Sequence, residues 1–248
     1  MHIPDGFINN GAAAGLAGAT VTAVAFAIRK IRKSFLEKVP VLRARLATFP
    51  DFGGGSDVSF QNRLSKLGRE KMWRMASVGA LIFSLQMVNF PIGGGTSGHL
   101  LGGVLAALIL GPFEALLVMT ILLSTQALLF GDGGVLALGA NIFNMGIVSA
   151  LGGYAFFRFL MNGRMGKDRF LRSAFVAAWV SVIAAAIATS FEIAFSGTKG
   201  LSVVLPAMTL THVVIGFMEG IITILVVSFL VKRGYTLAIF EKEERYAE

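Results

Sequence analysis

The sequence predicts an all-α polytopic membrane protein, and three observations lead to this fold class. The chain has 248 residues, of which 55% are hydrophobic and only 15% are charged, whereas soluble domains contain about 25% charged residues. It has 30 glycines, a residue type that lets membrane helices approach closely. Lys and Arg gather between long apolar runs, as in the cytoplasmic loops of membrane proteins. We therefore expect one membrane domain, 1–248.

Seven apolar segments are long enough, or nearly so, to cross a bilayer, which takes about 17–25 residues for a helix. The predicted order is a polar loop, an extra transmembrane helix, a basic cytoplasmic loop, a six-helix core and a charged tail: residues 1–10, 11–28, 29–72, 73–231 and 232–248. The six core segments cover residues 73–90, 100–110, 113–130, 135–160, 174–195 and 203–231.

The basic residues predict the orientation of the chain. Residues 29–74 contain twelve Lys or Arg against four Asp or Glu, which places them in the cytoplasm. Seven spans then put the N-terminus outside and the C-terminus inside, and Lys199 is the only one of 22 Lys and Arg on the outer side. No basic segment precedes the first apolar run, so we expect no signal peptide and a retained Met1.

Part of the basic loop has two interpretations. Leu36, Val39, Leu42 and Leu46 recur at helical spacing, which is typical of an amphipathic helix on the inner leaflet. A solvated basic loop is the alternative, because prolines and glycines interrupt the segment.

Several classes of function are excluded or disfavoured by what the sequence contains. Cysteine is absent, so thiolate metal sites and Cys nucleophiles are excluded. The net charge of +8 does not indicate a nucleic-acid partner, because no basic face with interleaved aromatic residues is present. The Gly-rich stretch at residues 93–95 lacks the Gly-Lys-Ser/Thr ending of a phosphate-binding loop. No HExxH motif of a metalloprotease is present.

The N-terminal dipeptide Met1-His2 is a candidate metal chelator. The terminal amine, the amide nitrogen of His2 and its imidazole Nδ1 can form one five-membered and one six-membered chelate ring. Ni²⁺ and Cu²⁺ favour tetragonal nitrogen sites, and imidazole also suits cobalt and zinc. Pro4 would fix the direction of the chain behind such a site. The alternative is a frayed polar terminus.

His99 is the candidate for a fourth nitrogen ligand. It follows an outer Gly-rich segment whose backbone can pack closely around an inserted N-terminus. The alternative is a solvated residue at a helix start, with an ordinary N-cap from the preceding Thr96-Ser97-Gly98.

Polar residues within the predicted spans are costly in a membrane and suggest functional roles. For Gln86, Gln126 and Glu192 we expect hydrogen bonds between helices. His212 and Glu219 lie two turns apart on one helix face and could pair or orient the metal ligands. Asn141 and Asn144 also share a face and are candidates for holding the inserted loop. Ala76 and Ala80 form a small-residue strip suited to a partner helix, a weak signal in an Ala-rich chain.

Several motifs together resemble the NikM/CbiM proteins, the substrate-binding S components of energy-coupling factor (ECF) transporters for nickel and cobalt. They are MHIPDGF at the start, NFP and GGTSGHL up to residue 100, FGDGG at 130–134, and LGAN with NM at 138–145. The last span is also similar at His212, Gly216, Glu219 and Gly220. The resemblance covers the chain apart from residues 34–70, where the loop is longer than is usual in this family.

The resemblance implies a site for Ni²⁺ or Co²⁺ as bound substrate, formed by Met1, His2 and His99. Asp5 and Asp132, which lie in the shared motifs, are expected to support these ligands or hold the loop. The resemblance also implies a transmembrane T component, which would contact Ala76 and Ala80, two cytoplasmic ABC ATPases and a small accessory membrane subunit. It implies a subunit of an ATP-driven importer in a prokaryotic cell membrane, and no enzyme.

Two other hypotheses remain open on the residues alone. One is a stand-alone secondary carrier or channel for divalent metal with a path along Glu192, His212 and Glu219. The other is a membrane metalloenzyme centred on His212 and Glu219, for which no further ligand cluster is found. The sequence does not choose between nickel and cobalt, because both accept four nitrogens.

Overall fold

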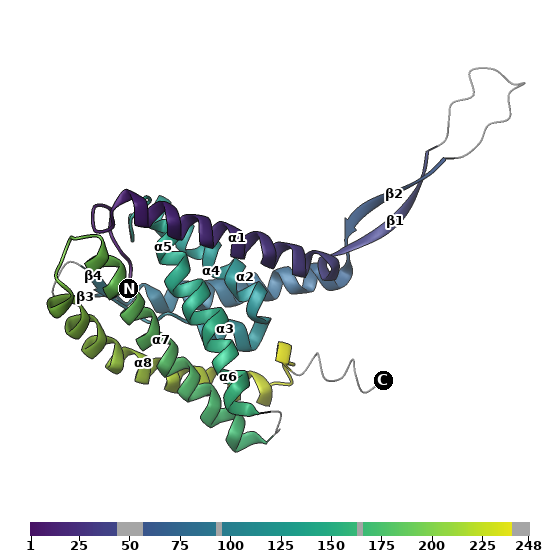
Figure 1. The fold of residues 1–248 in the computed structure, drawn as a ribbon. Coiled ribbons are helices and arrows are strands. Elements are labelled where there is room, and N and C mark those ends of the chain that lie inside the picture. Colours follow the sequence, from purple (N-terminus) through teal and green to yellow (C-terminus); the bar gives the residue numbers. More distant parts are fainter. Residues whose placement is uncertain (44–56, 93–95, 163–165, 240–248) are drawn as a thin grey trace, which may run out of the picture.

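The computed structural model describes residues 1–43, 57–92, 96–162 and 166–239. Helices form an elongated bundle, the N-terminus lies at one end of it, and a β-hairpin projects from the other end (Figure 1). The helices are α1 (Asn10–Phe35), α2 (Lys66–Gln86), α3 (Gly103–Leu110), α4 (Pro112–Thr125), α5 (Leu138–Ile142), α6 (Gly153–Met161), α7 (Lys167–Phe195) and α8 (Leu201–Lys232), with π-helical segments η1 (Gln126–Phe130) and η2 (Phe143–Gly152). The strands are β1 (Leu36–Arg43), β2 (Asp57–Leu64), β3 (Phe90–Ile92) and β4 (Thr96–Gly98).

The helical membrane fold is confirmed, and five helices of the described chain are long and apolar enough to cross a membrane. They are Asn10–Phe35, Pro112–Phe130, Leu138–Met161, Lys167–Phe195 and Leu201–Lys232. The second comprises α4 and η1, and the third comprises α5, η2 and α6. The other two predicted spans are helical but differ from these five. Helix α2 has 21 residues, but its first half is strongly charged, and α3 has only eight residues.

The prediction of an amphipathic helix at residues 36–46 is wrong for residues 36–43, the part that the structure describes. Strands β1 and β2 pair antiparallel, with Leu36 opposite Leu64 and Arg43 opposite Asp57. Helix α1 continues seven residues beyond its predicted end at residue 28, and α2 begins at Lys66 instead of Trp73. Ser65 caps α2 by accepting a hydrogen bond from the Gly68 N–H at 2.9 Å. Leu46 lies outside the described residues.

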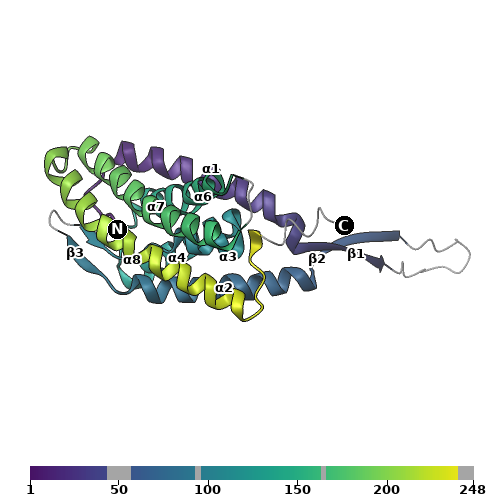
Figure 2. The same ribbon diagram turned by 90° about the horizontal axis from the view of Figure 1, so that it is seen from below.

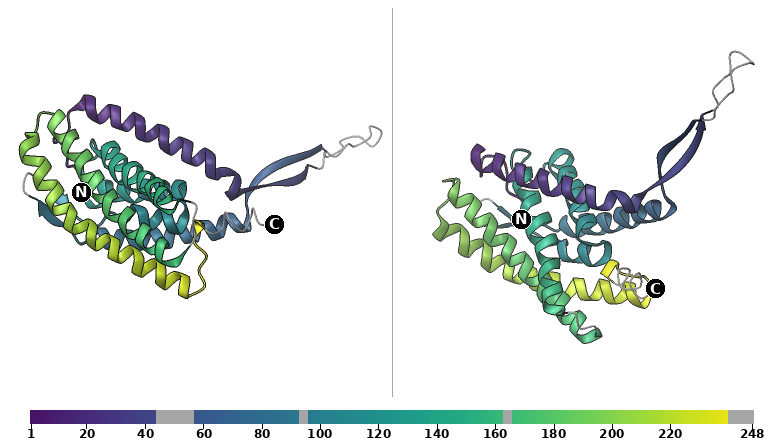
Figure 3. Two further views of the ribbon diagram at one scale, coloured as in Figure 1. Left: turned by 60° about the horizontal axis from the view of Figure 1, so that its bottom comes forward. Right: turned by 45° about the vertical axis from the view of Figure 1, so that its right-hand side comes forward.

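Helix α1 lies on the outside of the bundle (Figures 2 and 3). Asn9 caps its start by accepting a hydrogen bond from the Ala12 N–H at 2.8 Å. Only Thr20, Ala27 and Ile31 are buried along its 26 residues. This helix is therefore peripheral to the remaining helices, as expected for an extra span.

Helix α3 is the centre of the bundle, since all eight of its residues are buried. It begins at Gly103 instead of near residue 100, because residues 99–102 are extended or turned and Gly102 has a φ of 76°. Around it, α7 and α8 form a long pair in which a Cβ at Gly220 would lie 2.7 Å from the Phe175 ring. Glycine is needed there because the two helices approach so closely.

Candidate metal site

The first three residues of the chain are inserted into the end of the bundle. Met1 and Ile3 are fully buried, and His2 is 4% exposed. In the left-hand view of Figure 3 the N-terminus lies near the end of the bundle remote from the β-hairpin, beside α7 and α8. The N-terminus of this chain is therefore an internal element of the fold, which a frayed terminus would not be.

Hydrogen bonds hold the inserted segment along its backbone. Asn141 accepts a bond from the Ile3 N–H at 2.8 Å and donates its Nδ2 hydrogen to the Ile3 carbonyl at 3.1 Å. The N–H of Gly134 donates to the same carbonyl at 2.9 Å. Both backbone polar groups of the buried residue Ile3 are thus satisfied, which places His2 beside the loop of residues 131–134.

Asp5 attaches the segment to the start of α5. Its carboxylate accepts backbone N–H bonds from Val135, Leu136 and Ala137 at 2.8–3.3 Å. Negative charge near a helix N-terminus is stabilising, and the N–H groups of the N-cap of α5 and of the two residues before it are satisfied.

Gly133 is required for the close approach of the loop to His2. Its φ is 98°, and a Cβ there would lie 3.1 Å from His2 Cδ2 and 3.2 Å from Asn141 Nδ2. A side chain at this position would therefore be strained by the backbone and crowded by the site.

The rings of His2 and His99 stack at the inner end of this segment, with centroids 4.5 Å apart and an interplanar angle of 26°. His99 is 1% exposed, and its Nδ1 lies 2.7 Å from the Leu100 carbonyl, an obligatory acceptor. Nδ1 must therefore bear the ring hydrogen, and Nε2 presents a lone pair. This Nε2 is buried and has no hydrogen-bond partner in the described protein.

His2 contacts two polar side chains. Its Nε2 lies 3.2 Å from Gln126 Oε1, and its Nδ1 lies 3.2 Å from Asp132 Oδ1. Asn89 also approaches Asp132, with 3.5 Å between Nδ2 and Oδ1. Asp132, in the Gly-rich loop, therefore places a carboxylate beside the nitrogen that would chelate a metal.

Burial favours the neutral forms of the nitrogen groups. It lowers the pKa of the Met1 amine and of His99 well below their ordinary values. It also lowers the pKa of His2, although Asp132 opposes this shift. The charge of the amine contributes to lowering the pKa of His99. The hydrogen bond from His2 lowers the pKa of Asp132. These shifts favour the neutral forms, which are the forms that bind a metal ion.

The described residues contain no cluster of three or more His, Asp or Glu side chains arranged to hold a metal ion. The inserted segment adds two backbone nitrogens, those of Met1 and His2, to the imidazole nitrogens. The Met1 amine, the His2 amide nitrogen, the His2 imidazole and His99 Nε2 are four such donors in one buried place. Nitrogen donors of this kind suit Ni²⁺, Cu²⁺ and Co²⁺.

The pair expected between His212 and Glu219 does not form. Both are buried, but Glu219 accepts hydrogen bonds from the N–H groups of Leu101 and Gly102 at 2.6 and 3.0 Å. His212 Nδ1 lies 2.8 Å from the Met208 carbonyl, and its Nε2 has no hydrogen-bond partner in the described protein. Glu219 therefore fixes the backbone that follows His99.

Asn144 does not reach the loop, in contrast to Asn141. Its Nδ2 donates to Glu192 Oε2 at 2.7 Å. The helix-to-helix hydrogen bonding expected for Glu192 is confirmed. The same holds for Gln126 and Gln86, whose Nε2 and Oε1 lie 3.0 Å apart. The sequence did not reveal that Gln126 contacts His2. The position of Gln126 at the start of a π-helical segment, a feature frequent at functional sites, emerges only from the backbone.

Replacement of Asn141 by Leu is expected to weaken metal binding about 5–100-fold, since losing two bonds to the buried backbone of Ile3 costs about 1–3 kcal/mol. Nickel titration by calorimetry measures the loss. Thr189→Val is the control, because Thr189 is also buried and its hydroxyl has no partner in the described protein. Equal affinities for the Asn141→Leu protein and the wild type would contradict a role for Asn141 in holding the loop.

Fold and site together define a polytopic helical membrane protein with buried nitrogen donors at its N-terminus. Residues 58–237 match the sequence profile of the CbiM family, described as "Cobalt uptake substrate-specific transmembrane region". The chain belongs to this family.

Curated relatives agree with this assignment. The chain is 45% identical over 157 residues to a putative fused nickel transport protein NikMN of Archaeoglobus fulgidus, covering 62% of this chain and 51% of the relative. It thus spans about half the length of that protein. It is 35% identical to a putative metal transport protein of Haloquadratum walsbyi, covering 90% of this chain and 86% of the relative.

Solved structures have the same architecture. A crystal structure of a transition metal transporter matches with a TM-score of 0.77 and 32% identity, covering 100% of both chains. The S component of a bacterial ECF transporter matches with a TM-score of 0.51 at 18% identity, covering 68% of this chain and 99% of the other. The latter likeness concerns the fold alone.

Proposed function

We propose that this chain captures Ni²⁺ or Co²⁺ outside the cell as the substrate-specific subunit of an ECF-type importer. The observation that carries the proposal is the burial of Met1 and His2 against His99, with four nitrogen donors in one place. The relatives named for nickel and metal transport support this substrate class. The metal is bound and passed on as substrate, and the chain itself performs no chemical reaction.

The ligand set of the proposal is Met1, His2 and His99. Asp132 and Asn141 lie against the ligands, and Asp5 holds the loop that bears them. Glu219 supports the backbone after His99. For His212, whose buried Nε2 has no hydrogen-bond partner in the described protein, we propose a place beside the site.

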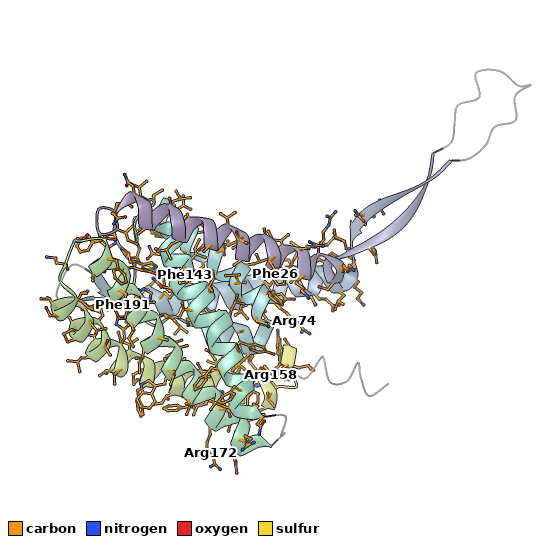
Figure 4. All side chains as sticks on the ribbon, in the orientation of Figure 1. Phe26, Arg74, Phe143, Arg158, Arg172 and Phe191 are labelled. Carbon is orange, nitrogen blue, oxygen red and sulfur yellow. The ribbon has the colours of Figure 1, made fainter. Side chains whose placement is uncertain are left out.

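The proposed topology has seven spans, with α2 and α3 added to the five long helices, and the N-terminus outside. The distribution of charge supports it. Arg74, Arg158 and Arg172 lie at the end of the bundle opposite the N-terminus, whereas Phe191 lies near the N-terminal end (Figure 4). The proposed division remains an N-terminal loop, an extra helix, a basic cytoplasmic segment, a six-helix core and a cytoplasmic tail.

The proposed partners are a transmembrane T component and two ABC ATPases, with an accessory membrane subunit. Ala76 and Ala80 are both exposed on α2, where a helix of the T component could approach closely. The S-component fold supports this arrangement.

The test is metal uptake by proteoliposomes that contain the purified chain alone or together with its T component and ATPases. We expect ATP-dependent uptake of Ni²⁺ or Co²⁺ only with the partners, because Glu192 and Glu219 are each engaged in hydrogen bonds within the bundle. Uptake by the chain alone under an ion gradient, equal to that of the full complex, would favour the alternative of a secondary carrier.

A further inference from the structure

Helices α7 and α8 enclose a groove at the end of the bundle opposite the N-terminus, where Arg172 of α7 also lies (Figure 4). Nearer the metal site the two helices are in close contact, because a Cβ at Gly216 or Gly220 of α8 would lie 2.7–2.9 Å from a side chain of α7. Helix α8 has no glycine after Gly220, and the groove, of about 440 Å³, lies beyond it. Its lining residues are Gly166, Lys167, Phe170, Leu171, Val227, Ser228, Val231 and Lys232.

The lining of the groove is suited to a hydrocarbon chain. Phe170 and Val227 are buried, and Leu171 and Val231 add further apolar surface to the lining. Val231 is 47% exposed, so the groove opens to the outside of the bundle. Since α7 and α8 are both long and apolar enough to cross a membrane, the groove opens toward lipid.

Two lysines stand at the end of this apolar groove. Lys167 is the first residue of α7 and Lys232 is the last residue of α8, and both are exposed. Among the described residues, neither lysine has a carboxylate partner. Asp168 follows Lys167 directly, but adjacent residues of a helix do not face each other. The groove therefore presents two positive charges beside an apolar lining.

We propose that this groove binds one anionic phospholipid of the inner leaflet, with its phosphate held by Lys167 and Lys232 and one acyl chain along Phe170 and Leu171. The choice of occupant rests on charge complementarity, since basic pockets between membrane helices on the cytoplasmic side suit anionic headgroups. The choice of leaflet rests on the proposed orientation, with the N-terminus outside. A bound headgroup holds the cytoplasmic end of the α7–α8 pair at the membrane surface.

Other occupants match only part of the groove. A soluble phosphate compound matches the two lysines but leaves the apolar lining without a partner. An apolar helix of a partner subunit matches the lining but leaves both charges without a counter-charge. A phospholipid carries a negative charge and a hydrocarbon chain in one molecule. Each basic residue near an anionic membrane surface strengthens the attraction about fivefold.

The test is lipid binding by the purified full-length protein in a neutral detergent, titrated with phosphatidylglycerol or phosphatidylcholine and read out by native mass spectrometry. We expect the wild type to retain one phosphatidylglycerol in preference to phosphatidylcholine. The double variant Lys167→Gln with Lys232→Gln should bind phosphatidylglycerol about 10–30-fold more weakly, because two charges of about fivefold each are removed. Val231→Trp fills the open side of the groove while both charges remain, and it should also lose phosphatidylglycerol.

The double variant Arg32→Gln with Lys33→Gln is the matched control, because it removes two exposed charges from the last turn of α1 and none from the groove. It should bind phosphatidylglycerol as the wild type does. Equal losses in both double variants would overturn the proposal, since they would show a general attraction to basic surface. Displacement of the lipid by inorganic phosphate would assign the groove to a free anion, and displacement on assembly with the T component would assign it to a protein partner. Either result would refute a lipid site.

Nickel titration separates this inference from the proposed function. The variant that lacks Lys167 and Lys232 should bind nickel as the wild type does, because the groove lies at the end of the bundle opposite the metal site. A wild-type protein that retains phosphatidylglycerol but binds no nickel would refute the proposed function and leave the lipid site standing.

Discussion

Addition of a single glycine before Met1 is expected to weaken the binding of Ni²⁺ or Co²⁺ on the order of 10³-fold. The extra residue converts the Met1 amine into an amide and moves the new amine one residue away from His2. The five-membered chelate ring is then lost, and with it the high effective concentration of a donor held next to the metal, which is worth about 10²–10⁴.

The structure adds a steric reason for this large effect. Met1 is fully buried, and burial lowers the pKa of its amine well below the ordinary value. The added glycine has to displace residues that now surround the amine, or withdraw His2 from its stack on His99. Either change removes a nitrogen donor from the site.

Equilibrium titration of purified protein with nickel, read out by calorimetry and by the visible absorption of the bound metal, measures the effect. The same glycine added after Glu248 is the matched control and should bind as the wild type does. Unchanged affinity in the N-terminal variant would falsify the assignment of the amine as a ligand.

The sequence predicted most of the fold where burial in a membrane dictates composition. The long apolar helices, α1, α4 with η1, α7 and α8, were found because about 20 apolar residues are needed to cross a bilayer. The hairpin of β1 and β2 was missed, because the spacing of the apolar residues in β1 was interpreted as helical. Helix α3 was predicted too long, because Glu219 holds the N–H groups of Leu101 and Gly102 across more than 100 residues of sequence.

The donors of the candidate site that are neighbours in the sequence could be predicted. Adjacent donors in Met1-His2 follow from the covalent structure, and the charge pattern placed His99 at the same end. The contact of Gln126 with His2 and its hydrogen bond with Gln86 could not be predicted, because the residues of these pairs are 124 and 40 positions apart in the sequence. Gln86 in turn donates to the Leu101 carbonyl, and only the packed bundle defines the position of this carbonyl.

Replacement of His99 by Ala is expected to weaken binding on the order of 10²-fold, because the fourth nitrogen of the site is removed while the chelate rings of Met1-His2 remain. The loss is smaller than for the glycine extension, since His99 closes no ring with the other donors. A water molecule or another weak ligand would complete the coordination, so the visible spectrum of bound nickel should shift as well as weaken.

The two readouts separate loss of a ligand from loss of packing. His99 stacks on His2, so its removal also leaves a cavity, and a purely structural effect would lower affinity without altering the spectrum of the remaining bound metal. Thr189→Val changes a buried side chain elsewhere and should alter neither readout. A His99→Ala protein that holds one nickel per chain with the wild-type spectrum would remove His99 from the ligand set. It would leave its stacking on His2 as the reason for its burial.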